Sequence, residues 1–204
     1  RPDALSGGQR QRVALARCLA GETRTILMDE PLANLDPHLR HAMERELRAF
    51  HDRSGVTTLF ITHDQREAMA LADVMAVMDN GRFLQVGTPE DIYERPANKM
   101  VACFIGRGAI LEAKVSGNEA SLLGQTVPVQ GHGSQTVFVR PRQIVPDPDG
   151  HRIKLHSVAY RGGHWEAVGS CADTKTEVML DLPHPARVGD EIGVRVTGGW
   201  VLPA

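Results

Sequence analysis

Two carboxylates and a histidine follow two apolar runs, at positions where phosphate chemistry could use them. Asp29 and Glu30 come directly after the apolar run 25–28, and His63 stands just beyond the run 56–61. One carboxylate can hold Mg²⁺ on a nucleotide, a second can orient and deprotonate a water, and a histidine can donate to a terminal phosphate. Taken singly, each feature also fits a strand-to-turn junction or a structural histidine.

A second candidate for phosphate contact lies near the start of the sequence. Ser6 can cap a helix, and it is followed by Gly7, Gly8 and Gln9 and then by the helical run 13–17. Backbone N–H groups at such a positive helix end converge without side chains in the way, which favours an anion. An ordinary serine-capped helix start is the alternative for Ser-Gly-Gly alone.

The elements that must position these residues have the pattern of an α/β fold. The runs 25–28, 56–61 and 74–78 are apolar on both faces, which predicts buried parallel strands. Their carboxyl ends form the edge at which open α/β sheets bind ligands. Between the first two runs, Asp36 followed by Pro37 predicts a helix N-cap with proline in the first turn.

The second half of the chain has a different pattern of predicted elements, in which short strands replace the alternation of helices and apolar runs. A turn at 79–81 predicts a hairpin, Thr88 and Pro89 predict a helix start, and 98–105 reads as a last short helix. After the glycines of 106–108 come short strands of alternating polarity, with Gly and Pro about every ten residues. This pattern predicts a small β-barrel of the oligonucleotide-binding kind, with Tyr160, Trp165 and Trp200 as its stacking candidates.

Composition excludes some classes of function. The chain has 23 Lys and Arg against 25 Asp and Glu. This balance does not indicate a basic surface that would bind a polyanion, so no nucleic-acid partner is expected. The three cysteines are scattered, and Cys18 and Cys103 are expected to be small core residues of a reduced protein. No signal peptide or membrane-spanning run is evident, so we expect membrane association to come through a partner.

Four short motifs together resemble the ATP-binding-cassette (ABC) ATPases. LSGGQ at 5–9, ILMDE at 26–30, ANLD at 33–36 and THD at 62–64 resemble that family's signature, Walker B, D-loop and H-loop, in its order and spacing. The resemblance implies ATP and Mg²⁺ as cofactors.

The resemblance also implies a role for each matching residue. Ser6, Gly7 and Gly8 of the signature, which Gln9 completes, would contact the γ-phosphate of an ATP held mainly by the opposite subunit. Asp29 would ligate Mg²⁺ through water, Glu30 would be the general base, and His63 would sense the γ-phosphate. Asp36 would communicate across the dimer.

One expected motif is absent from the sequence. No Gly-x-x-x-x-Gly-Lys-Ser/Thr loop occurs in it, so the fold class we expect is α/β: the C-terminal half of a P-loop ABC ATPase domain, followed by an all-β barrel. We expect the first half of the domain to be missing upstream, and the 204 residues alone to be inactive. The predicted domains are 1–106 and 107–204.

The second half narrows the resemblance to importers. Residues 87–106 resemble the connector of importer ATPases for maltose, polyamine, sulfate and iron(III), and 137–146 resemble the "RPE" strand of their C-terminal regulatory TOBE barrel. Arg142 stands where that group usually has Glu. Residues 104–115 and 123–129 most resemble the iron(III) importers.

These features predict the ATPase subunit of a prokaryotic ABC importer. It would work as a homodimer under two permease subunits on the cytoplasmic face of the membrane, served indirectly by a solute-binding protein. Ferric ion is the predicted solute, with sugar, polyamine, sulfate or molybdate as alternatives. A non-catalytic, ligand-sensing module is the alternative from another class. A soluble ABC protein of DNA repair or translation would predict a coiled-coil insertion or basic tail, which the sequence lacks.

Overall fold

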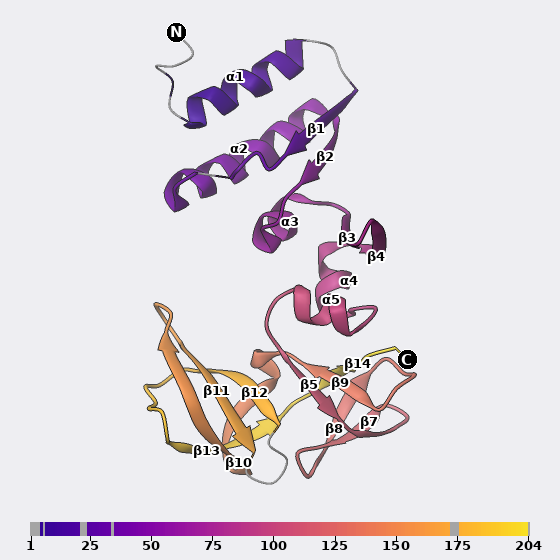
Figure 1. Ribbon diagram of the computed structural model, residues 1–204, viewed down its shortest axis with the longest axis vertical. Coiled ribbons are helices and arrows are strands. Elements are labelled where there is room, and N and C mark those ends of the chain that lie inside the picture. Colours follow the sequence, from indigo (N-terminus) through magenta and orange to yellow (C-terminus); the bar gives the residue numbers. More distant parts are fainter. Residues whose placement is uncertain (1–4, 6, 21–23, 34, 172–175, 204) are drawn as a thin grey trace. The chain divides into compact units, whose positions relative to one another are not determined.

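The computed structural model describes residues 5, 7–20, 24–33, 35–171 and 176–203 (Figure 1). The chain divides into two compact units, residues 1–75 and residues 76–204. The first unit mixes helices with parallel strands and the second is rich in β-structure, which confirms the predicted fold class. The sequence-based domain boundary between residues 106 and 107 stays a prediction.

The first unit contains two parallel strands and three helices. Helix α1 (Gly7–Ala20) precedes strand β1 (Thr25–Asp29), and helix α2 (Pro37–Ser54) leads to strand β2 (Thr57–Ile61). β1 and β2 pair in parallel, as the sequence predicts, and helix α3 (Gln65–Leu71) follows β2. Their carboxyl ends therefore lie at the same edge of the sheet.

Helix α2 supplies the core of the first unit. Its buried residues Met43, Leu47 and Phe50 are four and three positions apart, which places them on one helical face. They pack with Ile26 and Met28 of β1. Burying each such side chain contributes roughly 1.5–3 kcal/mol to folding. The helix begins as predicted, because the side chain of Asp36 accepts a hydrogen bond from the N–H of Leu39, 3.0 Å away.

The prediction that these strands are buried on both faces is wrong. Leu27 of β1 is 74% exposed, and Leu59 and Ile61 of β2 are each 56% exposed. Helix α2 covers one face of the pair, and within the described residues the other face is open to solvent. The same holds for the run 74–78, where Val74 and Met78 are exposed and Met75 and Val77 are buried.

The second unit begins with the predicted hairpin and helices. Strand β3 (Met75–Asp79) pairs with β4 (Arg82–Gly87) through a turn in which Asn80 and Gly81 have positive φ. Helices α4 (Pro89–Glu94) and α5 (Lys99–Phe104) follow. Thr88 and Asn98 cap them, each side chain accepting a backbone N–H three residues on.

Two antiparallel-rich sheets then form the bulk of this unit (Figure 1). One sheet has the order β12 (Glu177–Leu182), β11 (Trp165–Cys171), β10 (Ile144–Tyr160) and β13 (Glu191–Val196). The other has the order β5 (Ala109–Glu112), β9 (Thr136–Val139), β14 (Gly199–Val201), β8 (Gln125–Gln130), β7 (Glu119–Leu122) and β6 (Lys114–Ser116). A 3-10 turn, η2 (Pro141–Gln143), joins β9 to β10.

Both sheets contribute to one apolar core, as expected for a barrel. Leu111 of one sheet and Leu155, Leu180 and Val194 of the other belong to the same buried cluster. The predicted alternation holds on β12, where Val178, Leu180 and Leu182 are buried. The chain therefore combines an α/β part with barrel-like sheets of the TOBE type.

The segment 106–108 is closely packed within the second unit. A side chain at Gly108 would place its Cβ 2.3 Å from Cζ of Phe138 and 2.9 Å from the backbone oxygen of Val139. At Gly106, which has φ of +76°, a Cβ would lie 3.0 Å from the ring of Tyr93. Only glycine fits such approaches without displacing its neighbours.

Two further expectations concern cysteines and membranes. Cys103 lies on the exposed side of α5, whose buried face is formed by Val101 and Ala102, so its assignment to the core is wrong. The side chain of Cys18 lies outside the described residues. Across the described chain, no helix combines the length and apolarity that a bilayer crossing requires.

Candidate functional site

The carboxyl edge of the β1–β2 pair brings Glu30 and His63 together. Nδ1 of His63 lies 2.9 Å from Oε1 of Glu30, although 33 positions separate the two residues in the sequence. Both side chains are open to solvent, with 76% of His63 and 48% of Glu30 exposed. The predicted base and the predicted phosphate-sensing histidine thus form one accessible pair.

Glu30 is held by its backbone in an unusual conformation. Its φ is +44°, in the left-handed region that side chains other than Gly, Asn and Asp seldom adopt. Its N–H donates to the backbone oxygen of Ile61 at 2.8 Å, and its carbonyl accepts from the N–H of Ala33 at 3.1 Å. Leu32, which is fully buried, anchors the turn. Strained backbone of this kind is common at functional sites.

Glu30 also changes the protonation of His63. The hydrogen bond to Glu30 and the negative charge of that carboxylate raise the pKa of His63 above its ordinary value. A raised pKa increases the charged fraction of the imidazole near neutral pH. A charged imidazole is a better donor to a phosphate oxygen than a neutral one.

A set of polar contacts that sequence analysis missed fixes the loop carrying His63. Oγ1 of Thr62 donates to Oε2 of Glu67 at 2.8 Å and accepts from the N–H of Asp64 at 3.0 Å. Arg40 of α2 donates to Oδ2 of Asp64 at 3.1 Å and lies 3.6 Å from the carboxylate of Glu67. Glu67 is only 3% exposed. Because α2 and α3 each hold one end of this loop, His63 is positioned from two sides.

Asp64 has a second function as the cap of α3. Its side chain accepts from the N–H of Arg66 at 2.9 Å. Burial acts to raise the pKa of Asp64, but the backbone N–H groups of Arg66 and Glu67, together with the charge of Arg66, outweigh it and lower that pKa. The carboxylate stays ionised and available to Arg40.

Asp29 occupies the last position of β1, directly before Glu30. Its side chain is exposed and makes no hydrogen bond or ion pair with the described part of the chain. A carboxylate oxygen without a protein partner, at this edge, suits a hard divalent cation such as Mg²⁺. The residue present therefore fits the predicted metal.

The glycines at the start of α1 lie against two leucine side chains near the start of α2. A Cβ at Gly8 would lie 3.2 Å from Leu39, and one at Gly7 would lie 3.3 Å from Leu35. Gly8 is buried, whereas Gly7 and Gln9 are exposed. No contact joins these glycines to Glu30 or His63 among the described residues, and Ser6 lies outside them.

Comparison with known proteins identifies the family. The ABC transporter profile matches residues 1–33. The chain is 40% identical over its whole length to "Sulfate/thiosulfate import ATP-binding protein CysA" of Xanthomonas campestris, of which it covers 61%. The chain belongs to the family of ABC importer ATP-binding subunits.

Two further relatives differ in the solute that they are named for. The chain is 46% identical, over 95% of its length, to "Fe(3+) ions import ATP-binding protein FbpC" of Streptomyces coelicolor, of which it covers 56%. It is 45% identical, over 78% of its length, to "Spermidine/putrescine import ATP-binding protein PotA" of Acidothermus cellulolyticus, of which it covers 45%. The chain spans about half the length of the curated relatives it matches.

The segment that resembles the family's "RPE" strand contains a buried arginine, which directly follows β9. Arg140 is 3% exposed, and its guanidinium lies 3.8 Å above the ring of Tyr93. Its neighbour Arg142, at the position where Glu is usual, forms an ion pair with Glu94 of α4 at 2.5 Å. The arginine that departs from the family pattern thus has an acidic partner in the connector.

Proposed function

We propose that this chain is part of an ATP-binding and ATP-hydrolysing subunit that powers solute import. The observation that carries the proposal is the 2.9 Å contact between Glu30 and His63 at the carboxyl edge of two parallel strands. Family membership supports it, because the relatives are named as ATP-binding proteins of importers.

In this proposal Glu30 is the general base. Its carboxylate is solvent-accessible, and its backbone is fixed by the bonds to Ile61 and Ala33. Such a group can orient a water and accept its proton as the water attacks the terminal phosphate. His63 would donate to that phosphate, and Glu30 would hold its ring in position.

Asp29 would hold Mg²⁺ through water. When bound, that ion would neutralise charge on the phosphates. The signature residues would contact ATP held by the opposite subunit of a homodimer; they are Ser6, Gly7, Gly8 and Gln9. Asp36 would communicate between the two subunits of that dimer. Two membrane permease subunits would be the partners in transport, with the protein at the cytoplasmic face and a solute-binding protein delivering the solute.

The test uses the gene product that contains this chain, purified with its partners. Glu30→Gln keeps the shape of the side chain but removes the base, so turnover should fall by at least about a hundredfold while ATP binding is retained. Glu44→Gln, on α2 away from the edge, is the matched control. ATP hydrolysis at a near wild-type rate in Glu30→Gln would show that Glu30 is not the base.

For the solute we propose ferric ion. The segments 104–115 and 123–129 support this choice, as does the relative named for Fe(3+) import. Sulfate and polyamine are runners-up, because other relatives are named for them. Deleting the gene and measuring uptake of labelled iron, sulfate, maltose and spermidine decides among them. Normal iron uptake beside a defect in another solute would exclude iron.

A further inference from the structure

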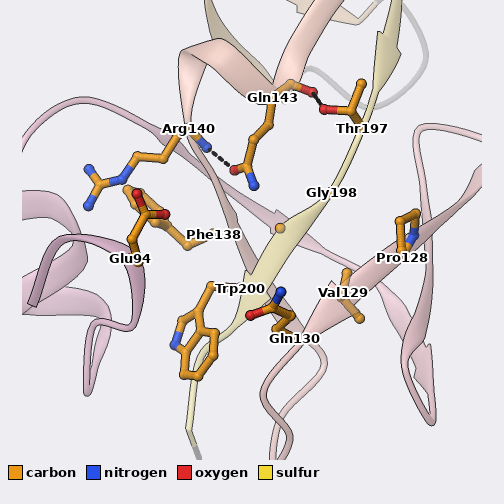
Figure 2. Close-up of a pocket in the computed structure, with 11 residues that line it drawn as sticks. Glu94, Pro128, Val129, Gln130, Phe138, Arg140, Gln143, Thr197, Gly198 and Trp200 are labelled. Atoms are coloured by element: carbon orange, nitrogen blue, oxygen red, sulfur yellow. Dashed lines mark hydrogen bonds between the residues drawn. The ribbon is translucent and has the colours of Figure 1, made fainter. Parts of the chain in front are cut away.

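The β-rich unit contains a polar pocket that is separate from the Glu30–His63 edge. Its volume is about 250 Å³, and its lining includes Glu94, Gln130, Phe138, Gln143 and Trp200 (Figure 2). It lies where β14 pairs with β8 for only two residues, Gly199 with Val129 and Trp200 with Gln130. All of its lining residues belong to the second unit.

Trp200 forms a fixed apolar wall of this pocket. Its indole Nε1 donates to the backbone oxygen of Pro96 at 3.1 Å, so the polar end of the ring is already satisfied. A Cβ at Gly131 would lie only 3.4 Å from two atoms of the ring, and the ring also packs against the cluster containing Phe138 and Leu202. A ligand that stacks on this ring would not have to immobilise it.

The polar groups around the ring have unused hydrogen-bonding capacity. Oε1 of Gln143 accepts from the N–H of Arg140 at 2.8 Å, whereas its Nε2 has no partner among the described residues. The amide of Gln130 lies beside the Trp200 ring in Figure 2, and it too has no hydrogen-bond partner among the described residues. Oε1 of Glu94 accepts a hydrogen bond from Arg142. The pocket therefore offers donors from both amides and acceptors from Gln130 and Glu94.

We propose that this pocket binds a small polyhydroxylated molecule, a monosaccharide or a polyol. The C–H groups of such a molecule can pack on Trp200, while its hydroxyls both donate and accept, as the amides and the carboxylate require. The volume is below the range of about 300–1,000 Å³ that drug-sized ligands occupy, so the ligand is small.

The charges of the lining favour a neutral ligand over an anion. Both Nη atoms of Arg140 already donate to backbone oxygens, those of Tyr93 and Ile105 among them, and only its buried Nε has no partner among the described residues. Arg142 is paired with Glu94, whose carboxylate lines the pocket and would repel an anion. Hydroxyl groups carry no such penalty.

The test follows the fluorescence of Trp200 in the 204-residue chain. The sequence has two tryptophans, so Trp165→Phe leaves Trp200 as the only one. Glucose, galactose, mannitol and glycerol are titrated to tens of millimolar, with sulfate, phosphate and adenosine as competing classes. We expect a saturable change in Trp200 emission with at least one sugar or polyol. Saturation-transfer NMR should show its C–H protons in contact with the protein.

Two variants locate the binding. Gln130→Ala removes a side chain that is exposed, so folding should be unaffected, but binding should weaken about two- to tenfold for the lost neutral hydrogen bonds. Thr126→Ala, also exposed on β8 but outside the pocket, should bind like the parent. The proposal is overturned if no sugar or polyol gives a saturable signal, if only an anion or adenosine does, or if Gln130→Ala binds as tightly as Thr126→Ala.

Discussion

Replacing Arg140 by methionine should destabilise the second unit by about 3–5 kcal/mol, because three backbone oxygens lose a charged donor and each buried polar group left unsatisfied costs about 1–3 kcal/mol. Its guanidinium donates to the backbone oxygens of Tyr93 and Ile105 at 2.6 Å each, and to that of Arg107 at 3.2 Å. Hydrogen bonds from a charged group contribute about 1.5–3 kcal/mol each. The burial of a guanidinium, which also lowers the pKa of Arg140, offsets part of this gain.

The neighbouring Arg142 provides a matched control. Its side chain is 60% exposed and pairs with Glu94, so Arg142→Met should cost no more than about 1 kcal/mol. Arg140→Lys should fall between the two, because one ammonium group does not replace the two Nη atoms that reach separate backbone oxygens.

Urea unfolding followed by tryptophan fluorescence measures these differences, since Trp165 and Trp200 both lie in the second unit. Hydrogen exchange of α5 gives an independent measure if Arg140→Met is too unstable to purify, because Arg140→Lys should already lose protection there. Equal losses in Arg140→Met and Arg142→Met, within about 1 kcal/mol, would refute the assignment of this stabilisation to the buried contacts.

Three further outcomes are expected. In an NMR titration the pKa of His63 should lie above its ordinary value and return toward it in Glu30→Gln; the stabilisation from this pair is complete below about pH 6.5 and is lost as pH rises through the raised pKa. The 204 residues alone should release no phosphate from ATP, because the sequence has no Gly-x-x-x-x-Gly-Lys-Ser/Thr loop; measurable turnover would contradict this. The exposed apolar face around Leu59 should cause self-association, which light scattering over a concentration series detects and which Leu59→Lys should reduce.

Local signals in the sequence are sufficient for most helix starts and for the β3–β4 hairpin. Asp36 and Thr88 were predicted as caps, and both accept the expected backbone hydrogen bond. The Asn80–Gly81 turn was predicted from two residues, because few other pairs adopt positive φ at both positions. These features depend on neighbours within three or four positions, so the sequence alone contains their cause.

The contacts that a one-dimensional pattern misses join distant residues. Arg40 meets Asp64 across 24 positions, and Arg140 meets the backbone of Tyr93 across 47. The local sequence does not show that either arginine has these distant partners, because an arginine side chain is usually solvated. The exposure of Leu27 was missed for a related reason: apolar periodicity shows that a face can be buried, but not which element covers it.

The placement of Glu30 and His63 shows how the two kinds of information combine. The register of β1 and β2 pairs Asp29 with Ile61, and the N–H of Glu30 then donates to the Ile61 oxygen, so strand pairing alone brings Glu30 to the level of the loop after β2. A shift of one residue would turn every side chain of β1 to the opposite face. Register therefore determines where Glu30 lies, whereas the contacts from Arg40 hold the loop that presents His63. Because Arg40 touches neither Glu30 nor His63 in these contacts, its part in the site is one of positioning.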